Sequence, residues 1–221
     1  MSEKYKPINF GSNSVFKALF TTIILFIIRI IMISMFQAVI KDSILANIIS
    51  FTILIIALFY IQRKELVKEL KSLGSTLRKM SIKVPLTIIL FLIIEYVTNG
   101  ILMNFLNTLP AGQDIIQESL KNNTVMIIIY LVILTPILET LFFFYPYKSI
   151  KNKKLAFLFS TIVFALFHMI TINNAIELLF LIPYIFMSAA FSYGFFKTGN
   201  IYMSIIVHAI NNLLAIVLLF I

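Results

Sequence analysis

Long apolar runs dominate this 221-residue chain and limit what it can fold into. A helix needs about 20 apolar residues to cross the roughly 30 Å hydrocarbon core of a bilayer. Stretches of about that length cover residues 15–40, 44–62, 84–106, 124–146, 155–172, 177–196 and 201–221. Hydrophobic residues make up 61% of the chain and charged residues 12%, which excludes an ordinary soluble domain. We therefore expect a multi-pass protein of the cell membrane.

The apolar stretches predict helices rather than strands. Strands of a membrane barrel alternate polar and apolar residues over about 10 positions, whereas these stretches are apolar on every side. The expected fold is all-α: a single membrane domain over residues 1–221, built as a transmembrane helical bundle of about seven spans. Residues 63–83 add a basic amphipathic pattern, interrupted at Gly74, that predicts an interfacial helix. A solvated basic loop that only sets topology is an equally good interpretation.

Basic residues are distributed unevenly among the loops. If the N-terminus is cytoplasmic, Lys4, Lys6 and the basic residues of 63–83 lie inside, and only Lys41 and Lys121 lie in outer loops. Cytoplasmic loops are enriched in Lys and Arg, so this pattern predicts a cytoplasmic N-terminus. The net charge of +9 then reflects topology and attraction to anionic membrane lipids, with no role in nucleic-acid binding.

Both histidines of the chain, His168 and His208, and the acidic Glu139 lie within apolar stretches. An ionisable group in hydrocarbon costs about 2.5 kcal/mol or more, so these residues indicate a functional site. Pro136 precedes Glu139 by three residues and is expected to loosen the helix there. His208 and Asn212 lie four apart on one helical face. Glu139 and His208 share a depth of roughly 10 Å from the inner boundary, whereas His168 is several residues deeper.

One carboxylate, two imidazoles and an amide suit hydrolysis by activated water. Glu139, with one histidine, would accept a proton from water, and the other histidine and Asn212 would stabilise an oxyanion. Alternatively, Glu139, His168 and His208 could bind a divalent metal such as zinc. The spacing does not separate these mechanisms. For either histidine alone, a simple interhelical hydrogen bond explains the sequence as well.

Three segments resemble the motifs of a known family: ETLFFF at 139–144, FALFH at 164–168 and HAINN at 208–212. They are similar to those of the CPBP family, which contains type II CAAX prenyl endopeptidases, lysostaphin-resistance-protein-like proteins and the Abi bacteriocin-immunity proteins. The resemblance covers residues 124–217. It implies an intramembrane endopeptidase for a membrane-associated peptide or protein. In that family, Glu139 and His168 would activate water, His208 and Asn212 would stabilise the oxyanion, and a metal is often assumed and disputed.

The first segment departs from the usual family pattern, Glu-Glu-x-x-x-Arg. Thr140 occupies the second position and Phe144 the last. Replacing both members of a buried charge pair together can be nearly neutral for the fold. The missing pair could orient the remaining glutamate or bind substrate, so the change bears on activity. The alternative function is therefore a catalytically impaired member that acts by binding, for example in bacteriocin self-immunity or in regulation of a membrane partner.

Two further ionisable residues, Arg29 and Glu95, lie within the first and third apolar stretches. Both stretches enter the membrane from the cytoplasmic side in the predicted topology, which places the two side chains at similar depth. We expect an interhelical ion pair between them, with substrate binding as the alternative. The cysteine-free chain, rich in Phe, Ile, Asn and Lys, together with the resemblance suggests a low-GC Gram-positive bacterium, which argues against prenylated substrates.

Overall fold

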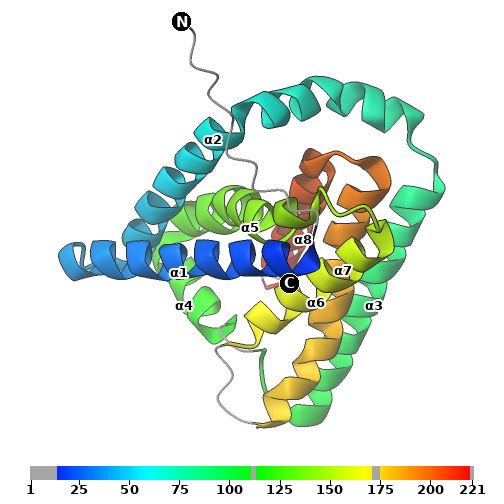
Figure 1. Cartoon of the computed structure of the whole chain (residues 1–221). Coiled ribbons are helices and arrows are strands. Elements are labelled where there is room, and N and C mark those ends of the chain that lie inside the picture. Colours follow the sequence, from blue (N-terminus) through cyan, green and yellow to red (C-terminus); the bar gives the residue numbers. More distant parts are fainter. Residues whose placement is uncertain (1–13, 111–112, 171–174, 220–221) are drawn as a thin grey trace, which may run out of the picture.

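Figure 1 presents the computed structural model, which describes residues 14–110, 113–170 and 175–219. Within these residues the chain is helical and contains no strand, so the predicted all-α fold is confirmed. The α-helices are α1 (Val15–Val39), α2 (Ser43–Lys79), α3 (Lys83–Leu106), α4 (Gln113–Ile128), α5 (Thr135–Phe143), α6 (Lys153–His168), α7 (Leu181–Thr198) and α8 (Ile201–Leu218). Three shorter elements join them: the π-helix η1 (Ile129–Leu134) and the 3-10 helices η2 (Tyr145–Tyr147) and η3 (Ala175–Phe180).

Six segments are long and apolar enough to cross a membrane. They are Val15–Val39, Ser43–Lys79, Lys83–Leu106, Asn123–Tyr147, Ala175–Thr198 and Ile201–Leu218. These segments correspond to six of the predicted stretches, and the chain is a multi-pass membrane protein. The remaining stretch, 155–172, corresponds to α6, which has 16 residues and ends at His168. At 1.5 Å per residue, α6 is about 24 Å long, which is shorter than the hydrocarbon core.

Helix α2 joins the second span and the predicted interfacial helix into one element of 37 residues. Gly74 does not interrupt it, because the helix continues to Lys79. Figure 1 shows α2 arching over the other helices before the chain turns into α3. Lys4 and Lys6, on which the orientation rests in part, lie outside the described residues. The cytoplasmic N-terminus stays a prediction.

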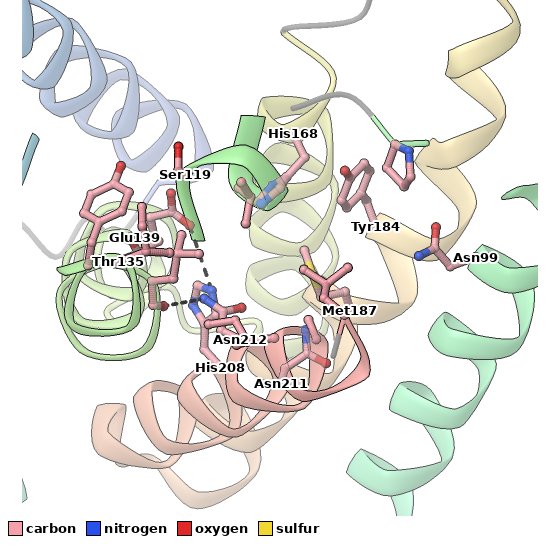
Figure 2. Close-up of a pocket in the computed structure, with 18 of the residues that line it drawn as sticks. Asn99, Ser119, Thr135, Glu139, His168, Tyr184, Met187, His208, Asn211 and Asn212 are labelled. Carbon is pink, nitrogen blue, oxygen red and sulfur yellow. Dashed lines mark hydrogen bonds and ion pairs between the residues drawn. The ribbon is translucent and has the colours of Figure 1, made fainter. Parts of the chain in front are cut away.

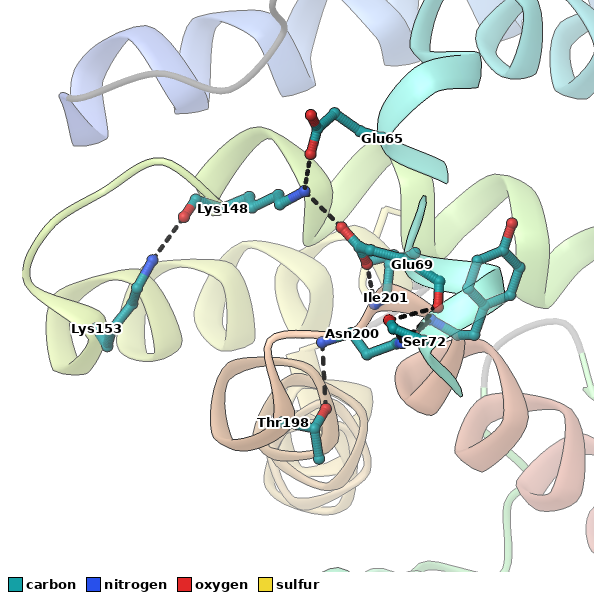
Figure 3. A network of polar contacts seen from close by, with 9 residues as sticks. Glu65, Glu69, Ser72, Lys148, Lys153, Thr198, Asn200 and Ile201 are labelled. Carbon is teal, nitrogen blue, oxygen red and sulfur yellow. Dashed lines mark hydrogen bonds and ion pairs between the residues drawn. The ribbon is translucent and has the colours of Figure 1, made fainter. Parts of the chain in front are cut away.

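The far half of α2 is fixed to the start of α8 by a group of polar side chains (Figure 3). This Glu69 cluster comprises Glu65, Glu69, Ser72, Lys148, Asn200 and Ile201. The carboxylate of Glu69 accepts hydrogen bonds from Lys148 Nζ and, at 2.6 Å, from the backbone N–H of Ile201, the first residue of α8. Asn200 caps α8 and donates to the backbone carbonyl of Glu69 at 2.8 Å. The negative charge at the N-terminus of α8 is also favourable to the helix dipole.

Helix α5 lies at the centre of the bundle, and eight of its nine residues are buried. It contacts α1, α2, α6 and α8, while α7 packs against α3, α6 and α8. Aromatic rings hold α5 against α6: the ring centroids of Phe143 and Phe164 are 5.2 Å apart, as are those of Phe144 and Phe164. Between α6 and α7, the hydroxyls of Ser160 and Ser192 are hydrogen-bonded at 3.0 Å. These contacts fix α5 and α6 relative to each other, and each carries a predicted site residue.

Candidate active site

A cavity of about 460 Å³ is lined by residues of all α-helices from α2 to α8 and of η1. We call it the central cavity; its polar lining includes Glu95, Glu139, His168, Tyr184, His208, Asn211 and Asn212. Figure 2 shows the labelled side chains reaching the cavity from different helices, with Asn211 and Asn212 on α8 and Tyr184 on α7. All four residues predicted to form the site, Glu139, His168, His208 and Asn212, therefore line one space.

Glu139 on α5 lies between an imidazole and a guanidinium. Its Oε2 is 4.0 Å from His208 Nε2, which agrees with the equal depths predicted for these two residues. Its Oε1 is 3.3 Å from Arg29 Nη1 on α1. The guanidinium of Arg29 also lies over the ring of Phe51, 4.9 Å from its centroid, and a cation over an aromatic face is stabilised there. Glu139 is thus held as one half of an ion pair inside the bundle.

The predicted ion pair between Arg29 and Glu95 is wrong. Arg29 pairs with Glu139, because α1 packs against α2, α5 and α6, while the main partner of α3 is α7. The prediction rested on their equal depth in the membrane, but Arg29 on α1 and Glu95 on α3 lie on helices with different packing partners.

His208 is 2% exposed and is enclosed by aromatic rings. Its imidazole stacks on Phe191, with centroids 4.3 Å apart and an interplanar angle of 18°. The ring of Phe164 meets it edge-on at 5.7 Å. These contacts orient the imidazole so that Nε2 points toward Glu139.

His168 is the last residue of α6, and its ring lies 4.6 Å from the ring of Phe164, which also contacts His208. Its Nδ1 is 3.1 Å from the backbone carbonyl of Phe164. A carbonyl oxygen only accepts hydrogen bonds, so Nδ1 carries the proton, and in a neutral imidazole Nε2 would then be the acceptor. The ring of Tyr184 flanks His168 at 4.9 Å. His168 was predicted to be deeper than its partners; it lines the same cavity, but no direct contact joins it to Glu139 or His208 among the described interactions.

The π-helix η1 explains how Asn212 is positioned. In a π-helix, each N–H bonds to the carbonyl five residues earlier, as Thr135 does to Tyr130. The next bond in this pattern would join residue 136 to Leu131, but Pro136 has no N–H. The carbonyl of Leu131 instead accepts a hydrogen bond of 2.7 Å from Asn212 Nδ2. The predicted loosening at Pro136 therefore takes the form of a π-helical turn to which α8 is attached.

Two further residues of the cavity are Glu95, for which substrate binding was predicted only as the alternative to an ion pair, and Asn211, which was not recognised from the sequence. Glu95 is 9% exposed, and its Oε1 accepts a hydrogen bond of 3.5 Å from Asn211 Nδ2. The backbone carbonyl of Asn211 accepts a hydrogen bond of 3.0 Å from the hydroxyl of Tyr96. One signal in the sequence could have identified Asn211: it follows His208 by three residues, which places it near the same face of the helix.

Residues 121–214, from the end of α4 into α8, match the family described as type II CAAX prenyl endopeptidase Rce1-like. We call these residues the Rce1-like region. It contains Glu139, His168, His208 and Asn212, in agreement with the resemblance found in the sequence motifs. Two other residues lie outside the Rce1-like region: Arg29, which pairs with Glu139, and Glu95, which lines the cavity. Neither a curated protein nor a solved structure matches the chain.

Thr140 and Phe144 of the Rce1-like region, the two departures from the usual motif, are both completely buried. Neither side chain lines the central cavity. The ring of Phe144 is stacked against Phe164 at an interplanar angle of 30°. An arginine at position 144 would need a partner inside this aromatic core, whereas Arg29 reaches Glu139 from α1 instead.

The three side chains predicted as possible metal ligands, Glu139, His168 and His208, do not converge on one point in this conformation. Among the residues that the structure describes, no group of three or more His, Cys, Asp or Glu side chains could hold a metal ion. Glu139 is engaged by Arg29, and Nδ1 of His168 is directed to the backbone of its own helix. In this conformation the side chains of Glu139, His168 and His208 are therefore not arranged as a preformed metal site.

Proposed function

We propose that this protein is an intramembrane endopeptidase of the CPBP type, which hydrolyses a peptide bond of a membrane-associated peptide or protein. One observation carries the proposal: Glu139 Oε2 and His208 Nε2, from different helices, lie 4.0 Å apart on the wall of a cavity that also receives His168. The match of the surrounding region to a protease family agrees with this chemistry.

The reaction needs a base for water, a stabiliser for the oxyanion and an acid for the leaving amine. Glu139 accepts a proton from a water molecule, with Nε2 of His168 as a second acceptor in the same cavity. The hydroxide attacks the carbonyl carbon, and His208 and the second N–H of Asn212 donate to the oxyanion. Collapse of the tetrahedral intermediate breaks the C–N bond, and the proton taken from water passes to the amine.

A test compares cells that produce the wild-type protein with cells that produce Glu139→Gln at equal membrane levels. Intact-mass profiles of small membrane peptides are expected to contain cleavage products only with the wild type. Loss of a general base typically lowers the rate by about 10²- to 10⁴-fold. Glu118→Gln, at an exposed position of α4, is the matched control. Identical profiles for all three proteins would reject the peptidase.

The second candidate function is binding without catalysis, for example in bacteriocin self-immunity or control of a membrane partner. Two observations favour it: Asn212 already donates to Leu131, and Glu139 is already paired with Arg29. Under this alternative, Glu139→Gln and His208→Ala would leave the host phenotype unchanged at equal membrane levels. Under the peptidase proposal, both variants would lose it.

A further inference from the structure

Glu95 is a buried carboxylate for which the described residues provide no cation. The four ion pairs found there join Arg29 or His208 to Glu139 and Lys148 to Glu65 or Glu69. Glu95 lies within the span Lys83–Leu106, in the wall of the central cavity. An acidic residue inside a membrane normally has a charged or polar partner and marks a pathway or site for a ligand.

Two hydrogen-bond acceptors next to each other lack donors at this point. Oε2 of Glu95 and Oδ1 of Asn211 are both buried, and neither has a hydrogen-bond partner among the described residues. The amide N–H of Asn211 is directed to the other oxygen of Glu95. A buried acceptor without a donor costs about 1–3 kcal/mol, more for a charged group. Both acceptors therefore favour a ligand that brings N–H donors and positive charge.

The position of these acceptors relates them to the proposed reaction. Asn211 follows His208 by three residues, or about 4.5 Å along the axis of α8. An extended peptide advances about 3.3 Å per residue. A side chain that reaches Glu95 and Asn211 would therefore belong to a residue one or two positions from the bond that His208 and Glu139 address.

We propose that Glu95 and Asn211 form a subsite for a lysine or arginine side chain of the substrate. This proposal rests on the proposed peptidase function. A lysine ammonium has three N–H donors and an arginine guanidinium five, which can satisfy both oxygens at once. Two oxygens would leave the shell of a hard metal ion such as Ca²⁺, which takes six to eight oxygen ligands, far from complete. Tyr184, across the cavity in Figure 2, adds an aromatic wall that tolerates a cation.

The test measures binding of two peptides to the purified full-length protein in detergent micelles. The probes are acetyl-Leu-Leu-Lys-Leu-Leu-amide and its counterpart with norleucine in place of lysine. The wild type is expected to bind the lysine peptide about 10-fold more tightly, the effect of one additional charge-assisted hydrogen bond. Glu95→Gln should abolish this preference, whereas Asn211→Asp should increase it. Glu118→Gln, an exposed change of the same kind, should retain it.

Equal or absent binding of the two peptides by the wild type would overturn the subsite, as would a preference that survives in Glu95→Gln. Cleavage of the same peptides is followed separately by mass spectrometry. Cleavage without a lysine preference would leave the peptidase standing and remove the subsite. A lysine preference that depends on Glu95, without cleavage of either peptide, would support the subsite and count against the peptidase.

Discussion

The Glu69 cluster and the central cavity are both built on buried glutamates, but only the cluster has its hydrogen bonds completed. Both carboxylate oxygens of Glu69 have donors, one from Lys148 and one from the backbone of Ile201. In the cavity, Glu95 Oε2, His208 Nδ1 and Asn211 Oδ1 have no partner among the residues that the structure describes. The cluster joins helices, whereas the cavity wall contains polar atoms without hydrogen-bond partners.

This difference has a physical basis. A buried charge with its partners in place stabilises the arrangement that holds it, and removal of one partner leaves the other uncompensated. A buried polar atom without a partner costs free energy in the unliganded protein. Such an atom persists at functional sites because a ligand completes its hydrogen bonds. The same substitution, loss of a glutamate charge, should therefore have different effects in the two regions.

Glu69→Ala should cause the largest loss of stability. It removes the buried partner of Lys148 and the acceptor at the start of α8, and breaking a buried pair costs about 3–5 kcal/mol. The free energy of unfolding can be measured by titration with sodium dodecyl sulfate in mixed micelles. Glu65→Ala is the matched control, because it pairs with the same Lys148 but its side chain is 53% exposed. That change should cost only about 0–1 kcal/mol, and equal losses for both variants would contradict the role given to Glu69.

Arg29→Gln should have the next largest effect, because it breaks the one part of the cavity that resembles the Glu69 cluster. The variant leaves Glu139 without its cation. The side chain of Arg29 is 20% exposed, so we expect a loss of about 2–3 kcal/mol, below the full value for a buried pair. Arg29→Lys keeps the charge and should recover part of the loss. If Arg29→Gln unfolds like the wild type, the ion pair with Glu139 does not stabilise the bundle.

Glu95→Gln should change stability by less than about 1 kcal/mol, or increase it, because no cation is left unpaired. This result would be opposite to that for Glu69→Ala in the same unfolding titration. The amide keeps an oxygen that can accept from Asn211. A loss as large as that of Glu69→Ala would mean that Glu95 has a structural partner and that the two regions are alike.

Much of the fold follows from the length of the apolar runs, but the end of α6 does not. Met169 and Ile170 continue the apolar run beyond His168. For that reason the stretch predicted from composition, 155–172, extends beyond the end of α6 at His168. Likewise, Gly74 lowers helix propensity without ending α2, which is attached to the start of α8 just before this glycine, at Glu69 and Ser72. Propensity is local, whereas these boundaries depend on tertiary packing.

The candidate site was predicted in part. Equal depth correctly predicted that Glu139 and His208 could meet, since depth can be counted along the sequence. The sequence does not show which helices are neighbours. For that reason Arg29 was predicted to pair with Glu95, whereas in the structure it pairs with Glu139. The hydrogen bond from Asn212 to Leu131 depends on a π-helical register that propensity does not specify. The catalytic roles of the four residues stay a prediction.

The smallest expected effect is a dependence of the Glu69 cluster on alkaline pH. Burial alone would lower the pKa of Lys148, but the hydrogen bond and the charge of Glu69 outweigh it, so the pKa is raised above its ordinary value of 10.5. A pKa that is higher in the folded state means that the protonated lysine stabilises the fold. This contribution is complete below the unfolded pKa and is lost as the pH rises through the folded pKa. The difference in unfolding free energy between the wild type and Lys148→Met should therefore stay constant from about pH 7 to 9 and shrink above about pH 10.5. A difference that does not change with pH would show that Lys148 acts through packing, and the cluster would then be held by the hydrogen bonds of Glu69 to α8 alone.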